Sequence, residues 1–350
     1  MTEADFHARA QSLRARATQA ISHAPSTRVR ALAASIGVSE AQWVAAGCGG
    51  LKVVPLTATP QAIFRVLPTL GRVMALTRNE WCVHERKGTY ENVHATGPMG
   101  LVLGPDIDLR LFFTQWSRAW AVEQEGRRSI QFFDAAGVAI HKVYLLEDTD
   151  AQAYEALVGT FTDADAPVWP EPVPYSPAVV PDTPTDQAGL RQAWLALEDT
   201  HDFFPMLKTF NVSRLGALRA AGKDLAQSVG ATQVEHMLTR AAEAGIPIMC
   251  FVGNRGMIQI HSGPVATLRR TGPWFNVLDP DFNLHLDTTA IDQAWVVNKP
   301  TSDGWVTSLE VYAANGELIV QFFGARKPGT PELAAWRALL IDLCPAPLAA

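Results

Sequence analysis

The sequence has no strong excess of charge of either sign. Its 350 residues include 29 Lys and Arg against 35 Asp and Glu, which gives a formal net charge of -6. Nucleic-acid-binding proteins usually carry a basic patch or stripe, so we expect no nucleic-acid partner. A mildly acidic chain can still hold an anionic ligand if it gathers Arg and Lys side chains locally.

Long apolar runs and paired cysteines are also missing. No stretch approaches the roughly 18 uninterrupted apolar residues that span a bilayer. The first residues, M-T-E-A-D-F-H-A-R-A, mix acids and bases and do not resemble a secretory signal. Cys48, Cys82, Cys250 and Cys344 form no C-x-x-C pair, so neither a zinc knuckle nor a redox pair has local support. We expect a cytoplasmic protein that is not embedded in a membrane.

The common catalytic motifs are absent as well. The sequence contains no G-x-G-x-x-G, G-x-x-x-x-G-K-[ST], H-E-x-x-H or G-x-S-x-G. This argues against a nucleotide-dependent enzyme, a zincin and an α/β-hydrolase, and leaves open enzymes that lack such signatures.

Residues 30–44 resemble a helix-turn-helix, with Gly37 in the turn and Ser39 as the N-cap of a second helix. A DNA-reading second helix would need basic side chains. This one has Glu40 and no Lys or Arg before Lys52. We therefore expect a helical hairpin that packs on its own domain.

The strongest positive feature is an internal repeat. Subtracting 175 from positions in the second half aligns Gly, Pro, Asn and Trp residues with identical residues in the first half, and the offset becomes 179 after Trp295. The matches include Asn254 with Asn79, Gly272-Pro273 with Gly97-Pro98, Pro280-Asp281 with Pro105-Asp106, Trp295 with Trp120, and Gly316 with Gly137. Because these residues set turns and packing positions, the pattern indicates a duplication.

We expect two copies, at 1–165 and 185–350, joined by an extended linker at 166–184 that contains seven prolines. In each copy helices precede strands. The expected helices are 3–20, 28–36, 186–198, 202–210 and 213–244, and the expected strands are 257–261, 274–278, 283–286, 293–298, 305–312 and 317–323. Hairpin turns are expected at 136–137 and 315–316. Consecutive short strands without intervening helices predict antiparallel sheets, and hence an α+β fold.

Histidines are the candidate metal ligands. His201 lies in L-E-D-T-H-D-F-F-P-M-L-K, beside Phe203, Phe204 and Met206. An imidazole in aromatic surroundings suits a flat apolar ligand that carries a metal, such as haem. The alternative is a surface or capping histidine at a helix start. His261 and His285 are expected on strands as hydrogen-bonded structural histidines, with His261 on the polar face.

Several cations lie beside apolar strands or helices, where they are either solvated or aimed into a cavity. They are Arg110, Arg214, Lys299 and Arg326. The planar guanidinium pairs with carboxylates in a bidentate manner, and the two propionates of haem need such partners.

The blocks N-R-G-M-I-Q-I-H-S-G, T-G-P-W-F-N-V-L-D-P, A-W-V-V-N-K-P-T and G-P-D-I-D-L-R-L-F-F carry a family resemblance. The chain resembles the hemin-degrading factors of Gram-negative haem-uptake systems, the HemS/ChuS/PhuS type, over essentially its whole length. The resemblance implies large antiparallel sheets in both halves with N-terminal helices beside them. It also implies one haem, held mainly by the second half in a cleft between sheet and helix.

The resemblance further implies roles for single residues. His201 matches the axial iron ligand, and Arg110 matches the distal arginine, with Phe112 as a neighbouring cavity residue. Arg214, Lys299 and Arg326 match pocket cations, and Gln321 matches a polar pocket residue. Two departures concern Val320, where some members have Tyr, and the absence of a second histidine between His201 and His236.

Two functions follow from the resemblance. A carrier would take imported haem from an inner-membrane ABC importer and pass it on, for example to a haem oxygenase. An enzyme would instead open the macrocycle itself and release iron, and Arg110 could then act in catalysis. A duplicated interaction scaffold without a ligand is a third reading. Both monomer and homodimer are compatible with the sequence.

Overall fold

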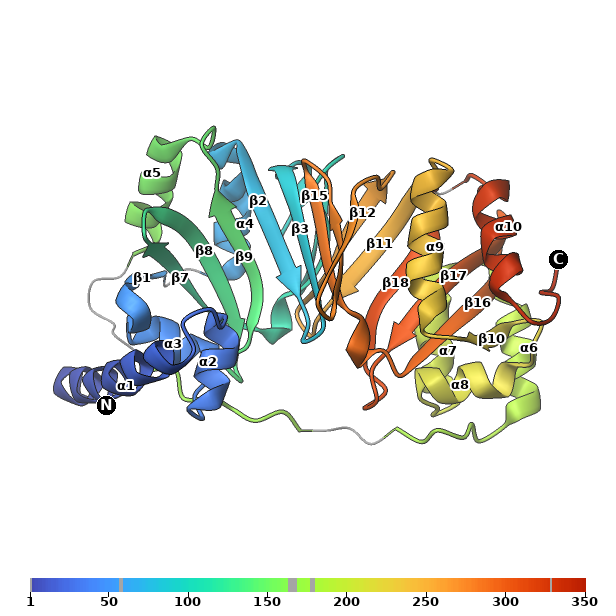
Figure 1. The fold of residues 1–350 in the computed structure, drawn as a ribbon, viewed down its shortest axis with the longest axis horizontal. Helices are drawn as coiled ribbons and strands as arrows, with labels where there is room; N and C mark the ends of the chain where they lie inside the picture. The colour runs from blue at the N-terminus through green and yellow to red at the C-terminus, as the bar shows by residue number, and fades with distance from the viewer. Residues whose placement is uncertain (1, 57–58, 163–168, 177–179, 328) are drawn as a thin grey trace. The chain divides into compact units, whose positions relative to one another are not determined.

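The structure is a computed structural model that describes residues 2–56, 59–162, 169–176, 180–327 and 329–350. The chain divides into two compact units (Figure 1). The first comprises Met1–Arg78, Glu85–Ser176 and Gly253–Gln259, and the second comprises Asn79–His84, Pro177–Val252 and Ile260–Ala350. Each half of the sequence therefore contributes one short segment to the unit that the other half forms. The sequence did not predict this exchange.

The first unit contains helices α1 to α5 and most of strands β1 to β9. The helices are α1 (Glu3–His23), α2 (Val29–Ser35), α3 (Glu40–Ala45), α4 (Pro60–Val66) and α5 (Ala151–Phe161), with 3-10 turns η1 (Cys48–Gly50), η2 (Leu67–Leu70) and η3 (Phe113–Gln115). The strands are β1 (Lys52–Leu56), β2 (Arg72–Arg78), β4 (Val93–His94), β5 (Met99–Leu103), β6 (Asp108–Phe112), β7 (Trp116–Gln124), β8 (Arg127–Asp134) and β9 (Ala139–Leu145). Strands β3 (Cys82–Thr89) and β12 (Met257–Gly263) cross the division between the units.

Strands of the first unit lie in the order β1-β7-β8-β9-β2, and β4, β5 and β6 pair consecutively. The pairs are antiparallel. Helix α3 packs on one face of the sheet, where Val44 meets Trp120 and Phe133. Helices α4 and α5 pack on the opposite face, where Phe64 and Leu157 join a core with the strands. Two covered faces explain why these strands are largely apolar.

The second unit repeats this plan. Its helical elements are α6 (Gln187–Leu195), η4 (Thr200–Asp202), α7 (Phe203–Thr209), α8 (Arg214–Ala221), α9 (Thr232–Glu243), η5 (Thr288–Ala290) and α10 (Ala334–Leu343). Its strands are β10 (Ala226–Val229), β11 (Ile248–Gly253), β13 (Leu268–Thr271), β14 (Trp274–Leu278), β15 (Phe282–Asp287), β16 (Gln293–Thr301), β17 (Gly304–Tyr312) and β18 (Leu318–Gly324).

Strands of the second unit lie in the order β10-β16-β17-β18-β11, and β13, β14 and β15 pair consecutively. Helices α6 to α8 pack on one face, through side chains such as Trp194 against Trp295. Helices α9 and α10 cover the other face, through Leu238 and Trp336. The α+β class, the antiparallel pairing and the duplication are confirmed.

Local sequence signals explain several boundaries. The predicted helical hairpin is α2 and α3, and Ser39 caps α3 by accepting a hydrogen bond from the Gln42 amide. Gly137 and Gly316, at the predicted hairpin turns, have φ values of 80° and 79°, a region that favours glycine.

One expected helix is wrong. Residues 213–244 form α8, strand β10 and α9 rather than one helical region. Helix α8 ends at Gly222, whose φ is 100°, and β10 then pairs with β16. Of the expected linker, residues 166–168 and 177–179 lie outside the described residues, and residues 169–176 and 180–184 contain no helix or strand. None of the helices in the described ranges is both long and apolar enough to cross a bilayer.

Candidate functional site

His201 lies in η4, the turn that leads from α6 into α7. The Asp199 carboxylate caps this turn, accepting one hydrogen bond from the His201 amide at 2.8 Å and another from His201 Nδ1 at 2.6 Å. Because an ionised carboxylate only accepts, Nδ1 carries a proton, and in the neutral ring the lone pair is therefore on Nε2. The His201 side chain is 86% exposed, so the turn presents an oriented basic nitrogen to a ligand.

The ionised state of Asp199 has a clear cause. The hydrogen bond from the His201 amide and the one from the His201 ring, together with the nearby Arg326 cation, hold the pKa of the Asp199 carboxyl below its usual value. A carboxylate that orients a ring nitrogen in this way is the usual support of a metal-bound histidine.

A buried carboxylate, Glu310, organises the cations nearby. Arg214 donates to both of its oxygens, at 2.6 and 2.7 Å, and Lys299 Nζ donates at 3.0 Å. Tyr312 donates from its hydroxyl at 2.6 Å. Burial opposes ionisation, but the Arg214 and Lys299 cations hold the pKa of the Glu310 carboxyl well below its usual range. Two cations thus share one carboxylate, which leaves the cluster with a net positive charge.

The two cations, Lys299 and Arg214, differ in how far their side chains are exposed to solvent. Lys299 is buried, with 3% of its side chain exposed, whereas 26% of the Arg214 side chain is exposed. Burial lowers the pKa of the Lys299 ammonium to about 8, although Glu310 acts in the opposite direction. Phe203 packs over both cations, with its ring centroid 4.4 Å from Lys299 Nζ and 4.9 Å from Arg214 Cζ. Since Phe203 directly follows η4, it ties the His201 turn to the cation cluster.

An aromatic floor lies beside the cluster. Gln321 on β18 is opposite Glu310 on one side and opposite Phe251 of β11 on the other, so the three side chains share one face of the sheet. The Phe251 and Phe323 rings meet edge to face at 5.1 Å on that face, and both are partly exposed. The face therefore offers aromatic surface next to positive charge.

Arg326 follows β18 and is also held in place. Its Nη2 atom donates to Asp303 Oδ2 at 2.9 Å, in the turn between β16 and β17, and its charge reaches Asp199. The second unit thus brings together five of the predicted residues: His201, Arg214, Lys299, Gln321 and Arg326.

Arg110 and Phe112 belong to the first unit. Both lie on β6, where Leu101 of β5 is opposite Arg110 and Met99 is opposite Phe112. The Arg110 guanidinium pairs with the Asp108 carboxylate on the same face of the strand. That these two residues serve the same ligand as His201 stays a prediction.

The two strand histidines are structural. His285 Nδ1 lies 2.7 Å from Asn276 Oδ1, as expected for a hydrogen-bonded histidine. The prediction that His261 points to a polar face is wrong, because it is 3% exposed and stacks on Phe282 at 3.7 Å. Strand β12 is covered on both faces, as the burial of its neighbouring residues Ile260 and His261 shows, so the alternation with Ile258 and Ile260 does not mark a solvated face.

Sequence reasoning named Phe203 as an aromatic neighbour of His201, but it missed two residues that build the site, Asp199 and Glu310. Asp199 had a signal, since Asp before Thr-His at a helix start is a capping pattern. Glu310 stands on a strand of apolar residues, and a charge at such a position needs a partner.

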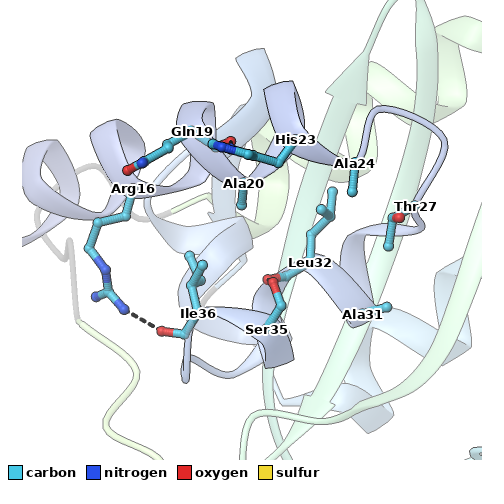
Figure 2. A pocket seen from close by; sticks show the side chains of 10 residues that line it. All are labelled: Arg16, Gln19, Ala20, His23, Ala24, Thr27, Ala31, Leu32, Ser35 and Ile36. Carbon is cyan, nitrogen blue, oxygen red and sulfur yellow. Dashed lines mark hydrogen bonds between the residues drawn. The ribbon is translucent and has the colours of Figure 1, made fainter.

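A separate pocket lies between α1 and α2 in the first unit (Figure 2). It has a volume of about 530 Å³ and is lined by alanines, Leu32 and Ile36, with Arg16 and His23 among its polar side chains. The Arg16 guanidinium donates to the Ile36 carbonyl at its edge. None of the residues predicted to bind haem lines this pocket.

Comparison with known proteins agrees with the duplicated fold. The profile of the haemin-degrading HemS.ChuX domain matches residues 37–161 and again 211–343, once in each repeat. The chain belongs to this family. Two curated relatives are 41% identical: hemin transport protein HemS of Yersinia enterocolitica, over 91% of this chain and 93% of the relative, and hemin transport protein HmuS of Yersinia pestis, over 93% and 95%.

Solved structures of the HemS.ChuX family share the fold. Holo-PhuS, a heme-binding protein from Pseudomonas aeruginosa, has a TM-score of 0.90 and 46% identity, covering 98% of this chain and 99% of that one. ChuS, described as a heme degrading enzyme of Escherichia coli O157:H7, has a TM-score of 0.90 and 35% identity, covering 96% and 100%.

Proposed function

We propose that this HemS.ChuX family member binds one haem per chain, through the second unit, with His201 Nε2 as the axial iron ligand. The observation that carries the proposal is the His201 turn, in which Asp199 fixes the proton on Nδ1 and leaves Nε2 exposed. A net positive cluster and an aromatic face lie in the same unit, and these are the features that an anionic aromatic macrocycle requires.

The other residues have distinct roles in the proposal. Arg214 and Arg326 pair with the propionates. Lys299 is covered by the Phe203 ring, and it contributes its positive charge rather than a free hydrogen-bond donor. Gln321 supplies a polar contact at the edge of the aromatic floor. Arg110 and Phe112 act on the open side of the iron, where a cation can hold water or stabilise a bound anion.

We propose cytoplasmic haem handling as the cellular role: the protein takes up imported haem for trafficking, for degradation that releases iron, or for both. The names of the relatives support both trafficking and degradation, since HemS and HmuS are hemin transport proteins and ChuS is described as a heme oxygenase. The inner-membrane ABC importer as donor and a haem oxygenase as acceptor are part of the proposal. The protein acts as a monomer or homodimer.

The decisive experiment combines haem titration with the His201→Ala variant. Wild type should bind one equivalent of haem and show an iron–histidine stretch in resonance Raman spectra. The variant should bind haem more weakly, with a shifted Soret band that external imidazole partly restores. Two equivalent strong sites per chain, or an unchanged iron–histidine stretch in the variant, would contradict the proposal.

A second measurement separates carrier from enzyme. With ascorbate or a reductase as electron source and catalase present, an enzyme yields a defined tetrapyrrole product over several turnovers. A carrier shows no such turnover and transfers haem rapidly to an apo haem oxygenase.

A further inference from the structure

The groove between α1 and α2 in the first unit has an apolar lining with a cation at its edge (Figure 2). Its volume of about 530 Å³ is typical of small-molecule pockets. Ala20, Ala24 and Leu32 supply apolar lining. Because an alanine side chain extends by a single carbon, the space between the two helices stays open, and a groove of this kind suits a slender apolar chain.

The second repeat provides an internal comparison. Gly37 and Asn211 both have positive φ values, 68° and 44°, and each precedes the dipeptide Val-Ser, so α2 aligns with α7 at an offset of 174. Three lining positions of α2 then correspond to larger residues of α7: Ala31 to Pro205, Ser35 to Thr209 and Ile36 to Phe210. The open groove therefore follows from the small side chains of the first repeat.

The segment that forms the groove is strongly basic. From Phe6 to Ser39 the sequence contains five Arg and no Asp or Glu, although the whole chain has a net charge of -6. Arg16 is exposed and has no ion pair in the part of the chain that the structure describes. One of its Nη atoms donates to the Ile36 carbonyl, and its other donors can pair with a carboxylate.

The second titratable side chain at the groove, His23, does not compete for that carboxylate. Its Nδ1 lies 2.7 Å from the Gln19 carbonyl, so Nδ1 carries a proton, and the neutral ring presents only an acceptor at Nε2. The head group of an anionic ligand therefore lies at Arg16. From Arg16 to Ala24 the helix covers about 12 Å at ~1.5 Å per residue, the length of an extended chain of roughly ten carbons.

We propose that this groove binds the anion of a medium-chain fatty acid, with the carboxylate on the Arg16 guanidinium and the alkyl chain along Ala20, Ala24 and Leu32. The groove shares no lining residue with the proposed haem site. The proposal therefore adds a second class of ligand and does not depend on haem binding.

Titration calorimetry with decanoate, below its micelle concentration, tests the site in the full chain. Arg16→Gln should weaken decanoate binding about tenfold, whereas Arg9→Gln, which removes an exposed arginine of the same helix that pairs with Glu171, should bind like wild type. Hexanoate, with four fewer methylenes, should bind about tenfold to a hundredfold more weakly than decanoate.

A second pair of variants tests the position of the alkyl chain. Ala31→Phe places a ring in the groove and should weaken decanoate binding by about tenfold or more. Ala34→Phe is the matched control, because Ala34 is also exposed on α2 but does not line the groove. If Ala31→Phe misfolds by circular dichroism, Ala31→Leu and Ala34→Leu test the same point.

Equal affinity of the Ala31 variant and its control would overturn the proposal, as would equal binding of decanoate and decyltrimethylammonium, which carries the opposite charge. Competition with haem distinguishes the two sites: decanoate should bind equally well to the ligand-free and the haem-saturated protein, and its displacement by haem would assign it to the haem site. Binding to phosphatidylglycerol vesicles without affinity for free decanoate would overturn the proposal too, and would identify the basic segment as a membrane-surface contact.

Discussion

Asn79 and Asn254 occupy equivalent positions of the two repeats and make equivalent hydrogen bonds in opposite units. Asn79 accepts from the amides of Trp81 and Cys82 and donates to the Ile319 carbonyl. Asn254 accepts from the amides of Gly256 and Met257 and donates to the carbonyls of Ile140 and Arg78. Ile140 and Ile319 differ by 179, the offset that the sequence repeat predicts. The two asparagines therefore fasten the exchanged segments, each to the unit formed by the other half.

This relationship predicts an effect on the stability of the fold. Asn254→Ala leaves two amides and two carbonyls without their side-chain partner, and should lower the free energy of unfolding by about 2–3 kcal/mol. The change should appear as a lower urea midpoint. Asn254→Asp keeps the acceptor for the two amides and should lie between the Ala variant and wild type. Equal midpoints for all three proteins would show that the segment is held by other contacts.

The sequence predicts the duplicated α+β fold well, because Gly, Pro and Asn positions control turns and survive divergence. It does not predict the exchange of segments, since a repeat offset is the same whether Asn254 contacts its own half or the other. The buried cluster around Glu310 cannot be predicted from the sequence for a related reason. Arg214 and Glu310 are 96 residues apart, and only the fold shows that these two charges neutralise each other.

We expect Asp199 to set the orientation and the tautomer of the proposed iron ligand, His201. Removal of its carboxylate in Asp199→Ala frees the His201 ring to rotate and to change tautomer. Loss of the residue that orients a metal-ligating histidine typically costs tenfold to a hundredfold in affinity, and we expect that range for haem. The iron–histidine stretch should also shift, because the ring nitrogen loses its acceptor. Asp202→Ala is the matched control, as it removes the adjacent acid; an equal effect of both variants would argue against a specific role for Asp199.

The propionates should account for a separable part of the affinity. A charge-assisted hydrogen bond contributes about 1.5–3 kcal/mol, so Arg326→Gln should weaken haem binding about tenfold to a hundredfold. The same substitution should have little effect on binding of haem dimethyl ester, which lacks the carboxylates. Wild type that binds the ester as tightly as haem would rule out the propionate role of these cations.

Lys299 should make haem affinity depend on pH in the alkaline range. Its pKa is lowered to about 8 by burial, so the ammonium loses its proton as pH rises through 8, and the cluster with Arg214 and Glu310 goes from net positive to neutral. Carboxylate binding should then weaken by up to about tenfold per pH unit.

The stability of the ligand-free protein should change with pH in the opposite direction. The pKa of Lys299 lies below its ordinary value of 10.5, so the unfolded chain binds more protons between pH 8 and 10.5, and this lysine makes stability rise with pH. Lys299→Met, which keeps Glu310 paired with Arg214, should remove both slopes. Haem titrations and urea midpoints at pH 7 to 10 measure them, and a variant that retains the wild-type fall in haem affinity would assign that fall to another group.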